Sequence, residues 1–143
     1  MDIKFIIALI GLTGVVVSAL VQYYLGRQAE SNKKTIEIRT NAYLDFVNSV
    51  SEIASSAQHN QNRSLNQLQK LNQAKTRVVL IGSDEVVNAI HTFWSKFGSL
   101  DSEDAISSFS IIISAMRKDL SGGKSLPNDI LKEALFNKKQ SNK

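Results

Sequence analysis

Residues 5–26 read FIIALIGLTGVVVSALVQYYLG, and this run decides the architecture that the sequence predicts. The run is 22 residues long and contains no charged side chain. As an α-helix it would extend about 33 Å, at about 1.5 Å per residue, which matches the hydrocarbon thickness of a bilayer. A globular helix of this length would carry a polar face, and this run has none. We therefore predict that residues 5–26 form a transmembrane helix.

A cleaved signal peptide is the main alternative to a membrane anchor. The sequence VSA at residues 17–19 places small residues where a signal peptidase cuts. However, the segment before the run carries only Lys4 against Asp2, and the apolar sequence continues beyond Ala19 to Leu25. Both features favour a segment that stays in the protein.

Basic residues near the two ends of a span predict its orientation, because they are retained on the cytoplasmic side. One basic residue, Lys4, precedes the run. Four follow it and form what we call the basic collar: Arg27, Lys33, Lys34 and Arg39. The sequence therefore predicts a single-pass membrane protein with residues 1–4 outside and the remaining chain in the cytoplasm. The collar would face anionic lipid headgroups.

Small residues share one face of the predicted span. Gly11, Gly14 and Ser18 are spaced by three and four residues, and Gln22 extends the same face. Small side chains let membrane helices approach closely, and a glutamine can hydrogen-bond between them. The alternative is that glycine is simply common in membrane helices. We expect a homo-oligomer that packs through this face, because a lone span has only lipid or another copy as a neighbour.

Apolar residues with helical spacing continue after the span. No glycine or proline occurs in residues 27–80, so the membrane helix can run on without a break to about residue 57. A second apolar stripe follows: Leu65, Leu68, Leu71, Ala74, Val78 and Ile81. Gly82 is expected to end this second helix in a left-handed conformation.

Capping residues divide the rest of the chain into further helices. Ser83 is placed to cap a third helix, and Asp101 or Ser102 a fourth. Pro127 suits the first turn of a short fifth helix. No segment shows the sustained alternation of a β-strand. The expected fold class is all-α: one transmembrane helix that continues into a cytoplasmic bundle of four to five helices within residues 27–136, followed by a disordered basic tail at 137–143.

Aromatic side chains indicate where the helices of this bundle meet. Phe46, Phe93, Trp94 and Phe109 lie on the apolar stripes of three different helices. Their spacing is that of a buried helix face, which favours a core over a cofactor site.

The residue inventory argues against an enzyme. The 143 residues include no cysteine, which excludes disulfides, a thiol nucleophile and thiolate metal sites. His59 and His91 are the only histidines, and no nucleophile stands beside a base in a recognisable spacing. We expect no catalytic residue, no metal and no cofactor.

Positive charge is modest, with a net charge of +4. Basic and acidic residues are mixed along the chain, so we expect no binding to a nucleic-acid polymer. Arg117, Lys118 and Lys124 border the turn at Gly122 and Gly123, whose amides could bind an anionic small molecule. The alternative is a solvated helix end, where basic residues favour the negative carboxyl terminus.

Three stretches together resemble known proteins: RTNAYLDF at residues 39–46, VVLIGSDEV at 78–86 and AMRKDL at 115–120. The chain is similar to short bacterial inner-membrane proteins with one amino-terminal membrane helix and a cytoplasmic helical domain, most of which have no assigned activity. The resemblance implies this fold and topology and supplies no catalytic residue.

In architecture alone, the chain is also similar to membrane-anchored antiviral effectors of bacteria, including the cyclic-oligoadenylate-gated membrane proteins of type III CRISPR systems. That similarity implies a ligand that acts between cytoplasmic domains and a membrane helix that disturbs the bilayer. Our first hypothesis is a non-enzymatic, oligomeric membrane effector that binds a ligand or a protein partner. The second is a passive anchor that recruits a cytoplasmic enzyme. A lysis protein of the holin type would contradict the charge distribution.

Overall fold

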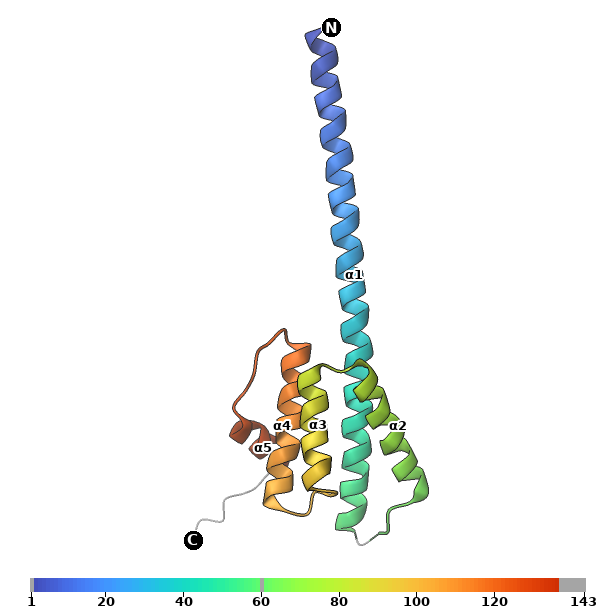
Figure 1. The fold of residues 1–143 in the computed structure, drawn as a ribbon, viewed down its shortest axis with the longest axis vertical. Coiled ribbons are helices and arrows are strands. Elements are labelled where there is room, and N and C mark those ends of the chain that lie inside the picture. The colour runs from blue at the N-terminus through green and yellow to red at the C-terminus, as the bar shows by residue number, and fades with distance from the viewer. Residues whose placement is uncertain (1, 60, 137–143) are drawn as a thin grey trace. The chain divides into compact units, whose positions relative to one another are not determined.

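The computed structural model describes residues 2–59 and 61–136, without the side chains of Phe5, Ala8, Leu9 and Leu12. The predicted disordered tail at residues 137–143 lies outside the described residues. Five helices make up the described secondary structure: α1 (Ile3–Gln58), α2 (Leu65–Ile81), α3 (Asp84–Lys96), α4 (Glu103–Leu120) and α5 (Asn128–Phe136) (Figure 1). No strand occurs in this part of the chain, which confirms the all-α class.

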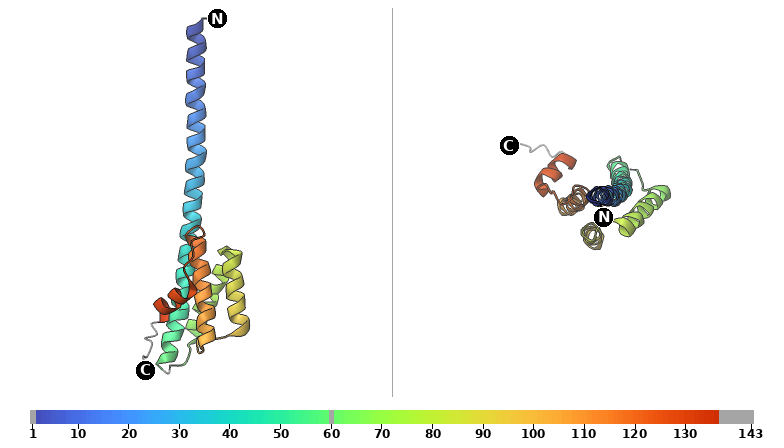
Figure 2. Two further views of the ribbon diagram at one scale, coloured as in Figure 1. Left: turned by 90° about the vertical axis from the view of Figure 1, so that its left-hand side faces the viewer. Right: turned by 90° about the horizontal axis from the view of Figure 1, so that it is seen from above.

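The chain divides into two compact units, Met1–Ile38 and Arg39–Lys143. The first unit is the amino-terminal part of α1, and every side chain described in residues 2–38 is exposed. The second unit is a helical bundle in which α4 packs against both α3 and α5 (Figures 1 and 2). Across the residues that the structure describes, no helix has both the length and the apolarity that crossing a membrane requires.

The core of the bundle contains the predicted aromatic residues. Phe46 is fully buried, and its ring centroid lies 5.9 Å from that of Trp94. Phe93 contacts Trp94 at 4.8 Å and Phe109 at 6.0 Å between ring centroids. These contacts join α1, α3 and α4 and confirm the predicted meeting point. Aliphatic residues of these three helices and of α2 complete the core, among them Val50, Val78, Val86, Ile90, Ile112 and Met116.

Serine side chains cap the starts of three helices: Ser64 caps α2, Ser83 caps α3 and Ser102 caps α4. Ser83 accepts a hydrogen bond from the Val86 amide at the start of α3, as predicted. Ser102, rather than Asp101, caps α4 by accepting from the Ala105 amide. Such caps satisfy backbone amides that have no partner within the helix.

The predicted conformation of Gly82 is wrong. Gly82 ends α2 with a φ of -72°, which is not left-handed, and its amide donates to the Val78 carbonyl. A Cβ atom here would lie 2.6 Å from the Val78 carbonyl oxygen and 3.3 Å from the Tyr43 hydroxyl. Glycine is therefore required for space, not for its backbone angle. The left-handed glycines are Gly122 and Gly123, which follow α4.

The predicted apolar stripe of α2 is wrong at its beginning. Ala74 and Val78 are buried, but Leu65 is 86% exposed. At about 100° per residue, Leu65 lies on the opposite side of the helix from Ala74. Leu71 and Ile81 of the stripe pack against the core as partly buried residues, whereas Leu65 lies outside it.

Candidate functional site

A polar cluster joins three segments of the bundle. Arg39 of α1 donates from Nε to the Ile81 carbonyl oxygen at 2.8 Å and from Nη1 to Asp119 Oδ1 of α4 at 3.0 Å. The Tyr43 hydroxyl, one turn further along α1, donates to Asp119 Oδ2 at 2.6 Å. The same hydroxyl accepts a hydrogen bond from the Ser83 amide at 3.4 Å. We call this the Arg39–Tyr43–Asp119 cluster.

Partial burial strengthens the interactions of the cluster. The side chain of Asp119 is 11% exposed and that of Arg39 is 32% exposed, so water screens this ion pair less than one on an open surface. Burial and the hydrogen bond to Asp119 together raise the pKa of Tyr43 to about 12, against smaller opposing effects of the Ser83 amide and Arg39. Tyr43 therefore stays neutral and keeps its proton on the bond to Asp119.

The chemistry of the cluster is that of a structural tie. Both carboxylate oxygens of Asp119 already accept hydrogen bonds from within the protein. Two nitrogens of the Arg39 guanidinium donate hydrogen bonds within the protein. The cluster holds α1 to the turn between α2 and α3 and to the end of α4.

The cluster connects the three stretches that carry the sequence resemblance, residues 39–46, 78–86 and 115–120. Sequence reasoning assigned Arg39 to the basic collar and gave no role to the Tyr43 hydroxyl or to Asp119. One signal pointed to it: Asp119 lies in the last turn of α4, where the helix dipole disfavours a negative charge. A carboxylate at such a position needs a cationic partner.

The other collar residues lie in the exposed unit. Lys34 pairs with Glu30 at 3.4 Å, and Arg27 Nη1 donates to the Tyr23 hydroxyl at 3.4 Å. Lys33 is exposed. Arg39 therefore differs from the other three, because its charge is matched within the bundle.

The structure does not bring together the three basic residues that we expected to bind an anion, Arg117, Lys118 and Lys124. Lys118 Nζ contacts both carboxylate oxygens of Glu85, at 3.2 and 2.9 Å, whereas Arg117 and Lys124 are exposed. The Gly123 amide donates to the Lys118 carbonyl at 2.9 Å, so it closes the end of α4. An open pocket here is lined by Ser83, Glu85, Lys118, Asp119, Gly122 and Gly123. The structure thus brings Lys118 into a pocket with two carboxylates, and Arg117 and Lys124 are not among the lining residues.

The small residues of α1 lie along one shallow groove. Gly11, Gly14, Ser18 and Gln22 line it together with Val15 and Ala19. A Cβ atom on Gly11 or Gly14 would meet nothing within 4 Å among the described residues, so no packing described within the chain requires glycine there.

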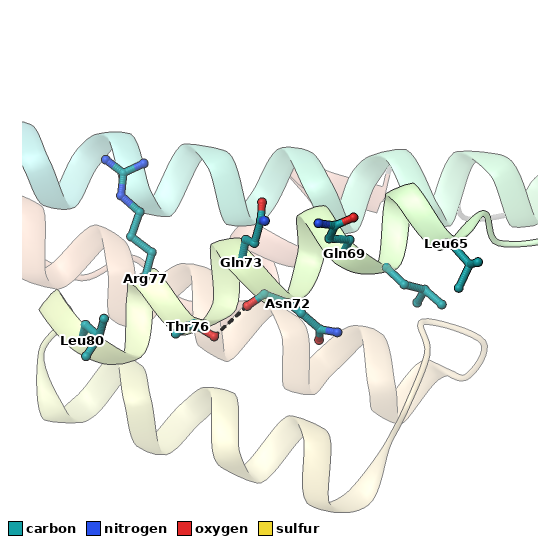
Figure 3. Close-up of a pocket in the computed structure, with 8 residues that line it drawn as sticks. Leu65, Gln69, Asn72, Gln73, Thr76, Arg77 and Leu80 are labelled. Atoms are coloured by element: carbon teal, nitrogen blue, oxygen red, sulfur yellow. Dashed lines mark hydrogen bonds between the residues drawn. The ribbon is translucent and has the colours of Figure 1, made fainter.

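A second open surface lies on α2 and was missed by sequence reasoning, which placed Leu65 and Leu68 on the buried stripe (Figure 3). We call it the outer face of α2, and it comprises Leu65, Leu68, Gln69, Asn72, Gln73, Thr76, Arg77 and Leu80. Leu80 is 78% exposed, almost as much as Leu65. The Thr76 hydroxyl is turned back onto its own helix, where it donates to the Asn72 carbonyl at 2.8 Å. The outer face therefore presents apolar ends and an amide-rich middle.

Among the described side chains, no group of three His, Cys, Asp or Glu residues comes close enough to hold a metal ion. No family model, no curated protein and no solved structure matches the chain.

Proposed function

We propose that the chain is a non-enzymatic, single-pass inner-membrane protein that forms a homo-oligomer and binds a partner through its helical domain. The observation that carries the proposal is the uncharged run at residues 5–26. The structure does not describe the side chains of four apolar residues in this run: Phe5, Ala8, Leu9 and Leu12. Their contribution to the proposal rests on the sequence alone.

Exposed apolar side chains around α1 support a lipid environment. Their exposed fractions lie between 42% and 75% for Ile3, Ile6, Ile7, Ile10, Val15, Val16, Val17, Leu20, Val21 and Leu25. A monomer in water rarely exposes so large a contiguous apolar surface. These residues lie on all sides of the helix, because neighbouring residues are about 100° apart. A protein partner covers one side of a helix, whereas lipid covers all sides.

The orientation follows from three basic residues that remain exposed. Arg27, Lys33 and Lys34 lie in the exposed unit, and each would contribute about 1 kcal/mol against anionic headgroups. Arg39 forms an ion pair with Asp119, so it contributes less to the attraction for anionic headgroups than the sequence implies. The amino terminus is then outside and the bundle is cytoplasmic.

We further propose that the protein acts as a membrane-perturbing effector, for example in antiviral defence. A partner or an anionic ligand bound by the helical domains of an oligomer would tilt or rotate the membrane helices. The lack of glycine and proline in residues 27–58 supports a stiff connection for such a movement. The alternative is a passive anchor that recruits a cytoplasmic enzyme. Expression of the chain alone separates the two, because an effector depolarises membranes or slows growth and an anchor does neither.

The membrane proposal is tested by fractionating cells that express the full chain. The protein should remain in the pellet after alkaline carbonate extraction, and the double change Ile10→Lys and Val16→Lys should release it. Each lysine costs about 3 kcal/mol within the bilayer. The double change Ile111→Lys and Ile130→Lys is the matched control, because it alters exposed apolar residues of the bundle. Extraction of the unchanged chain by carbonate would contradict the proposal.

A further inference from the structure

The outer face of α2 is unusual because it lies on a helix that carries charge elsewhere. The three charged residues of α2 all have partners within the bundle. Arg77 bonds to Asp45 at 2.9 Å, Lys70 lies 3.9 Å from Glu52, and the Lys75 ammonium lies 5.1 Å from the ring centre of Trp94. In Figure 3, Arg77 extends away from α2 toward α1. Arg77 is thus the one charged residue of the outer face, and its charge is paired with Asp45, while the rest of the face consists of apolar, amide and hydroxyl groups.

The residues of the outer face also form a straight seam. Leu65, Gln69, Asn72 and Thr76 follow one another at intervals of four, three and four residues, so they lie along one side of the helix with the spacing of a coiled-coil seam, although three of the four are polar. Val79 and Leu80, both exposed, extend the apolar end of the seam. A helix that presents this spacing can pack along its length against one other helix.

We propose that the outer face of α2 packs in parallel against the same face of a second copy of this chain. The proposal rests on the proposed membrane anchor, which would insert neighbouring copies side by side in one membrane. In a parallel pair each residue of the seam lies opposite itself, so leucines face leucines and amides face amides.

The charge pattern selects this occupant over others. A free lysine or arginine on the seam would oppose its own copy with a like charge, and none is present. Leucine packs against leucine, and the amides of Gln69 and Asn72 each donate and accept, so each can bond to its own copy. A charged protein partner would find no unmatched charge on this face. A lipid surface would have to dehydrate the central amides, which is unfavourable.

Cysteine cross-linking tests the interface, because the chain contains no cysteine of its own. Thr76→Cys should give a disulfide-linked dimer when membranes that hold the full chain are oxidised. Thr92→Cys is a matched control, because Thr92 is also exposed and also bonds to the carbonyl four residues earlier, that of Asn88. We expect about tenfold more dimer at position 76, since opposed thiols react at a high effective concentration. Equal yields at the two positions would overturn the interface.

The direction of packing is tested by mixing two cysteine variants that carry tags of different length, so that a dimer of like chains and a dimer of unlike chains differ in size. Leu65→Cys chains should cross-link to one another, and Leu80→Cys chains should do the same. Cross-links that form only between Leu65→Cys and Leu80→Cys chains indicate antiparallel helices and would overturn the parallel arrangement.

A charge placed on the seam provides a second test. Asn72→Lys should reduce the Thr76→Cys dimer about tenfold through like-charge repulsion at close range. Asn88→Lys is the control, because Asn88 is exposed on α3 in the same relation to Thr92. Unchanged thermal unfolding by circular dichroism shows that either variant is folded. No loss of dimer in folded Asn72→Lys protein would count against the seam.

The same membrane pellets distinguish failure of this interface from failure of the anchor. A carbonate-resistant chain without a cross-link at position 76 overturns the interface and leaves the anchor intact. A carbonate-extracted chain overturns the anchor. In that case, a dimer at position 76 in the soluble fraction still supports the interface, and its absence overturns the interface as well.

Discussion

Helices α2 and α4 are almost equal in length, with 17 and 18 residues, but they use their side chains in opposite ways. Buried residues in α4 run along most of the helix: Ala105, Phe109, Ser110, Ile112, Ala115 and Met116. In α2, only Ala74 and Val78 are buried. Leu71 and Ile81 add partly buried contacts with the core, and a hydrogen bond from Gln67 to Ser56 at 2.8 Å joins α2 to α1. The comparison suggests that α4 carries much of the stability of the bundle, whereas α2 presents a surface.

Core truncation should show the largest difference between the two helices. Ile112→Ala in α4 removes a fully buried side chain and should lower the free energy of unfolding by about 2–5 kcal/mol. Leu65→Ala in α2 removes an exposed one and should change it by about 0.5 kcal/mol or less. Urea denaturation of the full chain in mild detergent measures both. Equal losses would refute the division of roles.

The ion pairs of the two helices should also differ. Asp119→Ala leaves Arg39 and the Tyr43 hydroxyl without their acceptor and should cost about 2–3 kcal/mol. Asp45→Ala breaks the bond to Arg77, which lies on an open surface, and should cost about 0–1 kcal/mol. The same urea titrations provide the values. A loss for Asp45→Ala as large as that for Asp119→Ala would show that α2 depends on its surface pairs.

The junction at the end of α2 should be sensitive to a single methyl group. Gly82→Ala places a Cβ atom 2.6 Å from the Val78 carbonyl oxygen, so the backbone must shift, at about 1–3 kcal/mol. At Gly98 a Cβ atom would meet nothing within 4 Å of the described chain, so Gly98→Ala is a control without this clash. Thermal unfolding followed by circular dichroism compares them. A neutral Gly82→Ala variant would show that the end of α2 adjusts freely.

Alkaline pH should lower the free energy of unfolding through Tyr43, which lies at the same junction. The pKa of Tyr43 is raised in the folded protein from 10.0 to about 12, so the folded state holds this proton more tightly. The stability that this difference contributes is complete below pH 10 and is lost as the pH rises toward 12. Urea titrations across this range should show a decline that Tyr43→Phe reduces. An identical decline in both proteins would exclude Tyr43 as its source.

Local sequence patterns were sufficient for the helices and for much of the core. Ser83 caps α3 as expected, because a cap depends only on a side chain and an amide three residues away. Phe46, Phe93 and Phe109 lie in the core as expected, because helical spacing marks a buried face. The uncharged run at residues 5–26 is equally local, and it carries the membrane proposal.

The predictions that failed depended on neighbours distant in the sequence. Gly82 was assigned a left-handed conformation, but a Cβ atom there would meet the nearby Val78 carbonyl oxygen and also the Tyr43 hydroxyl, which comes from 39 positions earlier in the chain. Leu65 was assigned to the core, but α2 turns its smaller residues toward α1 and leaves Leu65 uncovered. Arg39 was counted as a free collar charge, although it bonds to Asp119, 80 residues away.

Helix positions, caps and the apolar run are therefore readable from the chain, because they depend on interactions within a few residues. The partners of Arg39, the space beside Gly82 and the exposure of the outer face of α2 depend on how the helices of the bundle pack. Packing brings together side chains that are far apart in the sequence, so no short-range pattern relates them. Which face of a helix is buried depends on the shapes and charges of the helices that it contacts.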